Sequence, residues 1–152
     1  MYPRNISVKA NMKKSSAEAL EALFQVLGDR TRLRLLNLMA GGEVCVCFFV
    51  EVLDEPQPKI SRHLAYLRSA ELVATTRDGK WINYAIAPPE HPAARAAFDA
   101  VLAAMKDDRE LQRDRAALAR ACCSPRAPEQ LQRAPRPAIT PPKVSAAARG
   151  RR

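Results

Sequence analysis

Residues 57–86 read QPKISRHLAYLRSAELVATTRDGKWINYAI, and this stretch decides the fold. Over about Gln57 to Ser69 the apolar residues recur with the period of an amphipathic helix, and Pro58 suits the first turn of that helix. We therefore predict a helix here, with one face directed into a core. The residues of its inward stripe are Ile60, Leu64 and Leu67.

A charged β-hairpin is predicted directly after this helix. Two strand-like runs, Leu72 to Arg77 and Lys80 to Ile86, are rich in β-branched and aromatic residues. Asp78-Gly79 joins them, and this dipeptide is typical of a type I′ turn, in which both central residues need positive φ. A helix followed by such a hairpin predicts the second helix and the wing of a winged helix-turn-helix.

Two helices are predicted to precede this unit. The first ends at Gly28, and Asp29 suits the N-cap of the second, which Gly41-Gly42 terminates. The apolar stripe of the first helix is Leu20, Leu23, Phe24 and Leu27.

The remaining segments complete one domain. Residues 43–53 form a short helix or a buried strand, since periodicity alone cannot decide between them, and residues 92–121 form a last helix with a polar interruption at Asp107-Asp108. The predicted fold class is mostly α with a β-hairpin, in a winged helix-turn-helix domain that spans residues 15–121.

Composition and charge narrow the class of protein. The 152 residues carry 25 Lys and Arg against 16 Asp and Glu, a net charge of +9, and residues 124–152 alone hold +6 together with six prolines. This basic, Pro/Ala/Arg-rich tail has too little apolar area to offset its ordering entropy, so we predict disorder there. The chain has no apolar run of membrane-spanning length, no secretory signal and no catalytic constellation, so we expect a cytoplasmic protein that is not an enzyme and has no membrane partner.

The face of the predicted 57–69 helix opposite its apolar stripe is polar and basic. Gln pairs well with adenine, Arg with guanine, and Ser with bases or phosphate, while a charged wing tip suits phosphate or the minor groove. A solvated helix face would have a similar composition, but helix, turn, helix and charged wing in this order favour double-stranded DNA as the partner. The predicted DNA-binding residues are Gln57, Lys59, Ser61, Arg62, His63, Tyr66, Arg77 and Lys80.

The cysteines are the residues of this sequence best suited to bind a metal or metalloid. Thiolates select soft, thiophilic centres, and Cys45-Val46-Cys47 offers two of them, although buried cysteines also serve simply as core residues. On an ideal helix these two side chains point about 160° apart, so binding one small ion would require that turn to unwind. Cys122-Cys123 at the end of the last helix would either pack or supply a further thiolate.

Four segments resemble the ArsR branch of the ArsR/SmtB metal-sensing repressors: Leu27 to Leu36, Gly42 to Cys47, Gln57 to Leu64 and Gly79 to Tyr84. They occur in order within about residues 17–88. The resemblance implies a homodimer, joined through its first and last helices, that binds palindromic operator DNA. It further implies repression of an arsenical-resistance operon until trivalent arsenic or antimony binds as the inducer, with no catalytic cofactor.

The resemblance carries two metal ligands onto this chain, Cys45 and Cys47. The family pattern continues to a third cysteine, where this chain has Val50, and the usual Asp after the second cysteine is a phenylalanine. Trivalent arsenic binds three thiolates, whereas a methylated trivalent arsenical binds only two. Either Cys122 or Cys123 is therefore the third ligand, or the site has two thiols.

Other functions fit the same residues less well. The resemblance implies that the zinc and cadmium branch of the family needs Asp and His ligands spaced along the last helix, and residues 92–121 contain no His. A thiol redox-sensing repressor on the same fold is the main alternative, followed by a module that binds another protein through the basic tail.

Overall fold

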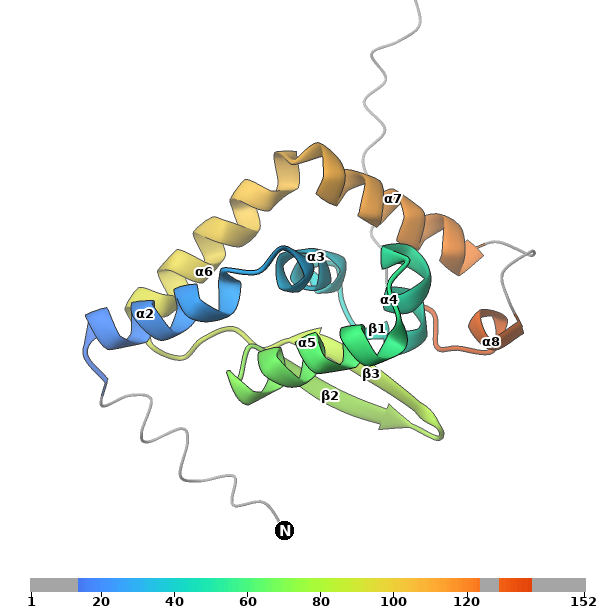
Figure 1. The fold of residues 1–152 in the computed structure, drawn as a ribbon, viewed down its shortest axis with the longest axis horizontal. Helices are drawn as coiled ribbons and strands as arrows, with labels where there is room; N and C mark the ends of the chain where they lie inside the picture. Colours follow the sequence, from blue (N-terminus) through green and yellow to red (C-terminus); the bar gives the residue numbers. More distant parts are fainter. Residues whose placement is uncertain (1–13, 124–128, 138–152) are drawn as a thin grey trace, which may run out of the picture.

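The computed structural model describes residues 14–123 and 129–137, and it confirms a mostly helical fold with a β-hairpin (Figure 1). The helices lie to one side of the β2–β3 hairpin, which projects from the body of the molecule as a wing (Figure 1). The elements are α2 Ser16–Leu27, α3 Arg30–Met39, β1 Val44–Cys45, α4 Val46–Leu53, α5 Gln57–Ser69, β2 Val73–Asp78, β3 Trp81–Ile86, α6 Pro92–Ala104, the 3-10 turn η1 Met105–Asp107, α7 Arg109–Cys123 and α8 Glu129–Gln132.

Local capping explains where the first helices begin. Ser15 and Glu18 form a reciprocal capping box at the start of α2, with the Glu18 N–H donating to Ser15 Oγ at 3.2 Å. Asp29 is the N-cap of α3, as predicted, because its Oδ1 accepts from the Arg32 N–H at 2.9 Å.

The core lies between the helices and one face of the hairpin. The predicted stripe of α5 is confirmed, since none of its three residues has exposed surface. The largest fully buried side chains are Phe48, Phe49, Phe98, Leu35, Leu36, Ile60, Leu64 and Leu67.

Residues 43–53 form both a strand and a helix. β1 pairs antiparallel with β3, so the hairpin becomes a three-stranded sheet in the order β1-β3-β2. The register sets Val44 opposite Tyr84 and Cys45 opposite Asn83. A two-residue strand is too short for sequence periodicity to reveal, because its pairing partner lies far along the chain.

The predicted turn of the hairpin is wrong in type and position. Asp78 pairs with Trp81, so the central residues are Gly79 and Lys80. Only Gly79 has positive φ, at 57°, which is the pattern of a type II′ turn instead of type I′.

The predicted single helix over residues 92–121 is also wrong, because α6 ends at Ala104 and α7 begins at Arg109. Asp108 has extended backbone angles, and its Oδ1 accepts from the Leu111 N–H at 3.0 Å, so this side chain caps the start of a new helix. The chain bends here, and α7 turns over α3 and α4 (Figure 1).

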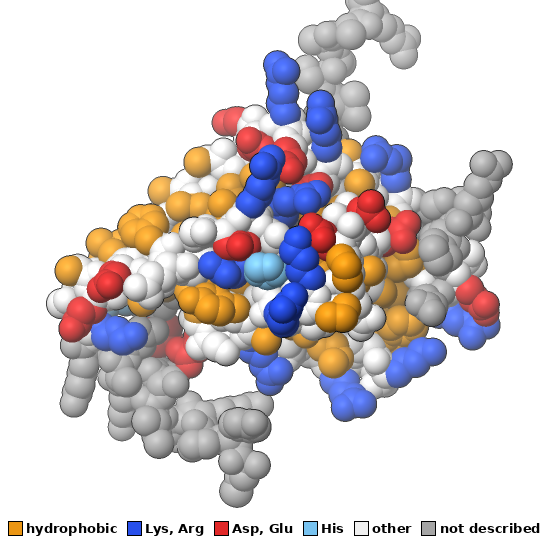
Figure 2. All heavy atoms as spheres, viewed as in Figure 1, with side chains coloured by type: hydrophobic (Ala, Val, Ile, Leu, Met, Phe, Trp, Pro, Cys, Tyr) orange, Lys and Arg blue, Asp and Glu red, His pale blue; other side chains and the backbone are white. Residues whose placement is uncertain are grey.

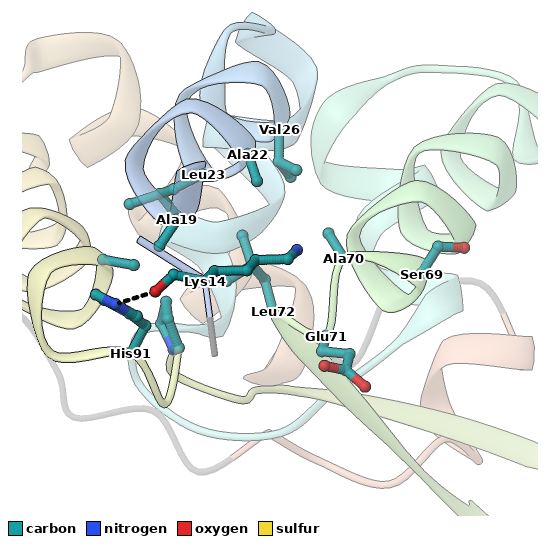
Figure 3. Close-up of a pocket in the computed structure, with 12 residues that line it drawn as sticks. Lys14, Ala19, Ala22, Leu23, Val26, Ser69, Ala70, Glu71, Leu72 and His91 are labelled. Carbon is teal, nitrogen blue, oxygen red and sulfur yellow. Dashed lines mark hydrogen bonds between the residues drawn. The ribbon is translucent and has the colours of Figure 1, made fainter. Parts of the chain in front are cut away.

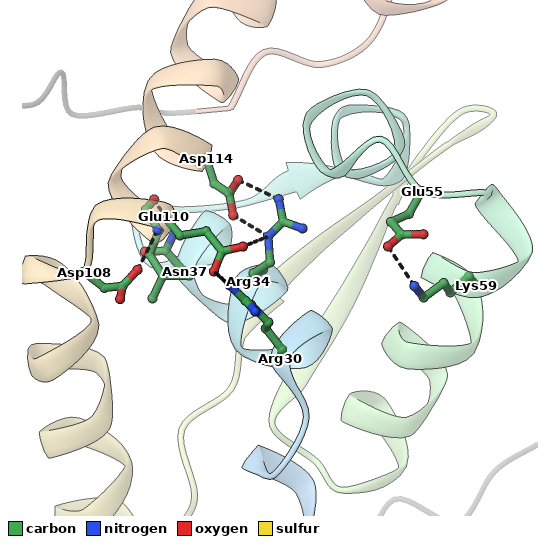
Figure 4. Close-up of polar contacts among 9 residues, drawn as sticks. Arg30, Arg34, Asn37, Glu55, Lys59, Asp108, Glu110 and Asp114 are labelled. Atoms are coloured by element: carbon green, nitrogen blue, oxygen red, sulfur yellow. Dashed lines mark hydrogen bonds and ion pairs between the residues drawn. The ribbon is translucent and has the colours of Figure 1, made fainter.

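A polar network fixes α7 against α3 (Figure 4). Arg34 donates two hydrogen bonds of 2.8 Å to the buried carboxylate of Asp114, which raises the pKa of the guanidinium. The buried Asn37 donates to the Leu111 carbonyl at 2.8 Å and accepts from Arg115 Nε at 2.9 Å. The network satisfies the buried polar groups and sets the position of α7.

The segment predicted to be a disordered tail contains a short helix within residues 129–137. α8 contacts α4 and α7, and Leu131 and Ala134 are buried, so two small apolar anchors order this part. Residues 124–128 and 138–152 lie outside the described residues. Among the described helices, none combines the length and the apolar character that crossing a membrane requires.

The end of α5 generates a stability prediction. Glu71 has a φ of 60°, and the N–H of Leu72 donates to the Leu67 carbonyl at 3.0 Å, the pattern of a Schellman cap. Glycine adopts this conformation without the steric cost that other residues bear. We expect Glu71→Gly to raise the free energy of unfolding by about 0.5–1 kcal/mol, measured by urea denaturation.

A matched substitution controls for the unfolded state. Glu51→Gly makes the same chemical change inside α4, where glycine should lower stability by about 1 kcal/mol. Equal losses in both variants would contradict the cap assignment.

Candidate functional site

The two cysteines of the Cys-x-Cys pair lie together at the junction of β1 and α4. Cys45 has extended backbone angles and is the N-cap of α4, while Cys47 lies in the first helical turn. The Cys47 thiol donates to the Cys45 sulfur, with 3.0 Å between the Sγ atoms. The prediction that a helical turn must unwind before both sulfurs can meet is wrong, because Cys45 lies outside the helix.

The contact between the two thiols changes how they ionise. The hydrogen bond from Cys47 lowers the pKa of Cys45 to about 7, and backbone N–H groups add to this effect. The same contact, together with burial, raises the pKa of Cys47. Cys45 is therefore the first of the two to ionise, at a pH near neutrality, and a thiolate beside a thiol suits attack on a thiophilic centre.

A third ligand is not assembled in the described part of the chain. No group of three His, Cys, Asp or Glu side chains suited to a metal ion occurs there. Cys122 is buried at the end of α7 without joining the pair, and the side chain of Cys123 lies outside the described residues. Val50, at the position of the missing family cysteine, lines the same cavity as Cys47.

That cavity, of about 420 Å³, lies beside Cys47. Its walls come from α4, from the start of α5, from the wing and from α8, which contributes the buried Leu131. The lining residues are Val46, Cys47, Val50, Glu51, Gln57, Lys80, Trp81, Ile82 and Leu131. The thiol pair thus adjoins a space large enough for a small molecule.

A second cavity, of about 260 Å³, lies between α2, the end of α5 and the start of α6 (Figure 3). No thiol lines it, and its one imidazole, His91, already contacts the Lys14 carbonyl at 3.2 Å and caps α6. The Lys14 side chain extends from beside His91 toward Ala70 (Figure 3). We assign no function to this cavity.

The outer face of α5 is exposed where the sequence predicts DNA contacts. Gln57, Ser61 and Arg62 are exposed, and so is Tyr66, at 48%. The guanidinium of Arg32 stacks over the Tyr66 ring at 4.4 Å, which places a further cation at this face. Sequence reasoning missed Arg32, because its helix precedes the helix-turn-helix and only the folded structure brings it to α5.

Two of the predicted contacts have partners within the protein. Lys59 Nζ lies 2.7 Å from Glu55 Oε1, and His63 Nδ1 lies 3.6 Å from Asp29 Oδ1. These side chains are half-buried, so they brace α5 as well as flanking its exposed face.

The wing tip carries exposed cations. Arg77 Nε donates to the Gly79 carbonyl at 3.0 Å, and Lys80 Nζ lies 5.0 Å from the centre of the Trp81 ring. Figure 2 shows one face of the molecule. Lys and Arg side chains lie over the middle of that face, around a histidine, and along its lower right edge, with acidic side chains among them.

Comparison with known sequences finds regulators. The profile of the family described as "Bacterial regulatory protein, arsR family" matches residues 29–75. The arsenical resistance operon repressor of Escherichia coli is 48% identical over 67 residues, 43% of this chain and 57% of that protein. The regulator ArsR1 of Pseudomonas putida is 42% identical over 86 residues, covering 56% and 64%, so the matches span less than two thirds of both relatives. The arsenical resistance operon repressor of Staphylococcus aureus is 37% identical over 75 residues, covering 47% and 72%.

Solved structures show the same fold. The transcriptional regulator HlyU of Vibrio vulnificus superimposes with a TM-score of 0.50 and 24% identity, covering 65% of this chain and 98% of that one. A predicted DNA-binding transcriptional regulator of E. coli also gives 0.50 and 24%, covering 68% and 98%. Relatives and fold neighbours are transcriptional regulators, not enzymes.

The position of α8 generates a prediction about access to Cys47. Burial of one leucine side chain stabilises a contact by about 1.5–3 kcal/mol. If α8 must detach before a reagent reaches the thiols, the Leu131 contact would slow their alkylation by roughly 10- to 100-fold. We expect truncation after residue 128 to speed alkylation of the Cys45–Cys47 pair by iodoacetamide within that range.

Truncation after residue 137 is the matched control, since it retains α8 while removing most of the basic tail. Equal alkylation rates in the two truncated proteins would show that α8 does not cover the thiol pair.

Proposed function

Because the chain belongs to the ArsR family of bacterial regulatory proteins, we propose that it is a cytoplasmic, homodimeric repressor that trivalent arsenic or antimony releases from operator DNA. The observation that carries this proposal is the Cys45–Cys47 pair, whose sulfurs lie 3.0 Å apart at a strand–helix junction of a winged helix. The regulatory relatives support the transcriptional role.

The chemistry of the pair suits a trivalent metalloid. Each thiol displaces one hydroxyl of arsenous acid as water, so two As–S bonds form and two water molecules leave. A structural zinc site needs four protein ligands, and the described residues assemble no group of three. Two thiols with one remaining non-protein substituent fit a trivalent, pyramidal centre better.

The exposed apolar surface supports the proposed dimer. Helix α2 packs against α6. On α2 the side chain of Phe24 is 54% exposed, and on α6 the side chains of Val101 and Leu102 are half-buried. Figure 2 shows hydrophobic side chains gathered at the upper left, over α6 and α2 of Figure 1. A two-fold dimer through these helices would present two copies of α5 to half-sites one helical turn apart.

The site is connected to both DNA-contacting elements. Cys45 pairs with the wing strand β3, and Cys47 belongs to α4, which leads into α5 through a turn at Asp54. Binding of both thiols to one atom therefore acts on the wing and on the helix-turn-helix together. Coupling between two such sites is typically about 1–3 kcal/mol, or 5- to 150-fold in affinity.

A second function also has one observation in its favour. A disulfide needs the sulfurs at about 2.05 Å, and they already lie 3.0 Å apart, so oxidation by a peroxide would require a small movement. Such a step converts two thiols and one hydrogen peroxide into a disulfide and two water molecules. The metalloid is the better fit, because only one residue separates the cysteines and the ring that a disulfide would close is strained.

The DNA contact is testable at Arg62, which is exposed on α5. Arg62→Ala should weaken binding to a duplex that the wild-type protein selects from a random library by about 1–3 kcal/mol, measured by fluorescence anisotropy. Arg113→Ala removes the same charge from an exposed position on α7 and should have little effect. Equal affinities for both variants, with intact circular dichroism, would mean that α5 does not read DNA.

The inducer site is testable with single thiol variants. Cys45→Ser and Cys47→Ser should bind DNA as the wild type does, yet arsenite should no longer release them, because a two-point chelate fails when either sulfur is lost. Cys122→Ser should respond normally if the pair suffices. Release of wild-type protein by hydrogen peroxide but not by arsenite would favour the redox alternative and reject the proposed inducer.

A further inference from the structure

One buried polar atom in the wing has no partner. Asn83 of β3 is only 7% exposed, and its Oδ1 accepts no hydrogen bond from the described part of the chain. A buried acceptor without a partner destabilises a protein, so such an atom calls for an explanation.

The strand register places this residue beside the thiol pair. Asn83 lies directly opposite Cys45 in the antiparallel β1–β3 ladder. Directly opposed residues in such a ladder project to the same face, with Cβ atoms about 4.5–5.5 Å apart. The register therefore places the carboxamide on the same face of the sheet as the Cys45 side chain, whose Sγ lies 3.0 Å from Cys47 Sγ. The three side chains come from β1, α4 and β3.

The chemistry of a two-thiol arsenical supplies what Asn83 lacks. Arsenous acid carries three hydroxyl groups, and condensation with two thiols releases two of them as water. The third remains on arsenic as a hydrogen-bond donor. A methylated arsenical bound through the same two sulfurs has a methyl group in that place and cannot donate.

We propose that Asn83 determines inducer specificity by accepting a hydrogen bond from the hydroxyl that stays on arsenic bound to Cys45 and Cys47. This inference rests on the proposed function and deepens it, because it names the substituent that the site recognises. Asn83 compensates for the cysteine that Val50 replaces, as an acceptor for the third substituent instead of a third thiolate ligand. The site should favour an inorganic arsenical over a methylated one relative to a site without the carboxamide.

The competing interpretation is that Asn83 is a strand residue without a role at the thiols. Its replacement would then change the response to every arsenical by the same factor. The informative quantity is therefore the ratio of two affinities, since general effects on folding or on thiol access cancel in it.

The experiment measures the affinity of the full-length protein for arsenite and for methylarsenite through thiolate–arsenic ultraviolet absorption. Asn83→Leu removes the carboxamide at similar volume and should weaken arsenite binding by about 3- to 10-fold while leaving methylarsenite within about twofold. Thr75→Val is the matched control, because it deletes a polar atom from β2 at similar volume, and Thr75 pairs with Tyr84, so its side chain projects to the face opposite that of Asn83. The ratio of the arsenite affinity to the methylarsenite affinity in this control should equal that of the wild type.

A second variant keeps the test decisive. Asn83→Ala removes the same oxygen with less volume, and it should shift the ratio in the same direction as the leucine variant. Thermal stability of Asn83→Leu should not fall below that of the wild type, since an unpaired buried acceptor is lost. An unchanged ratio in the variants that fold would overturn the role of Asn83, whereas a wild-type protein that binds neither arsenical would overturn the proposed function itself.

Discussion

Backbone pairing between β1 and β3 is the contact on which the functional architecture depends. This two-residue ladder fixes Cys45 opposite Asn83 and ends where α4 begins, so it holds the first sulfur outside the helix that carries the second. A continuous helix through both cysteines would point them apart. The same ladder attaches the thiol pair to the wing, so in the proposed function a bond formed at the two sulfurs acts directly on an element that contacts DNA.

The rest of the structure provides a rigid support for that junction. Asp108 ends one helix and starts another, and the bend brings Asp114 to Arg34 and Leu111 to Asn37 (Figure 4). Paired and hydrogen-bonded buried groups of this kind fix one arrangement, because separating them leaves uncompensated charge. α4 lies between this support and the wing, so strain at the thiols is more easily relieved toward the wing and α5 than toward α7.

Local signals in the sequence predicted the parts of the fold that local physics controls. The Asp29 cap, the apolar stripe of α5 and the two hairpin strands each depend on neighbouring residues, and each is confirmed. For residues 43–53 the sequence leaves a helix and a strand open and does not show that both form, because a strand of two residues exists only through a partner distant in sequence. The II′ turn follows from the pairing register of the hairpin, which the Asp78-Gly79 dipeptide does not fix.

In the candidate site, too, some features follow from local sequence and others only from tertiary contacts. Soft-ligand chemistry and spacing singled out the cysteines, whereas the unpaired oxygen of Asn83 and the stacking of Arg32 on Tyr66 emerge only from tertiary contacts. The most direct test of the central claim uses the reciprocity of binding linkage. Arsenite affinity is measured for the free protein and for the protein saturated with its selected duplex. Arsenite should bind the DNA complex about 5- to 150-fold more weakly, and equal affinities in the two states would contradict any coupling between the thiol pair and the DNA-binding surface.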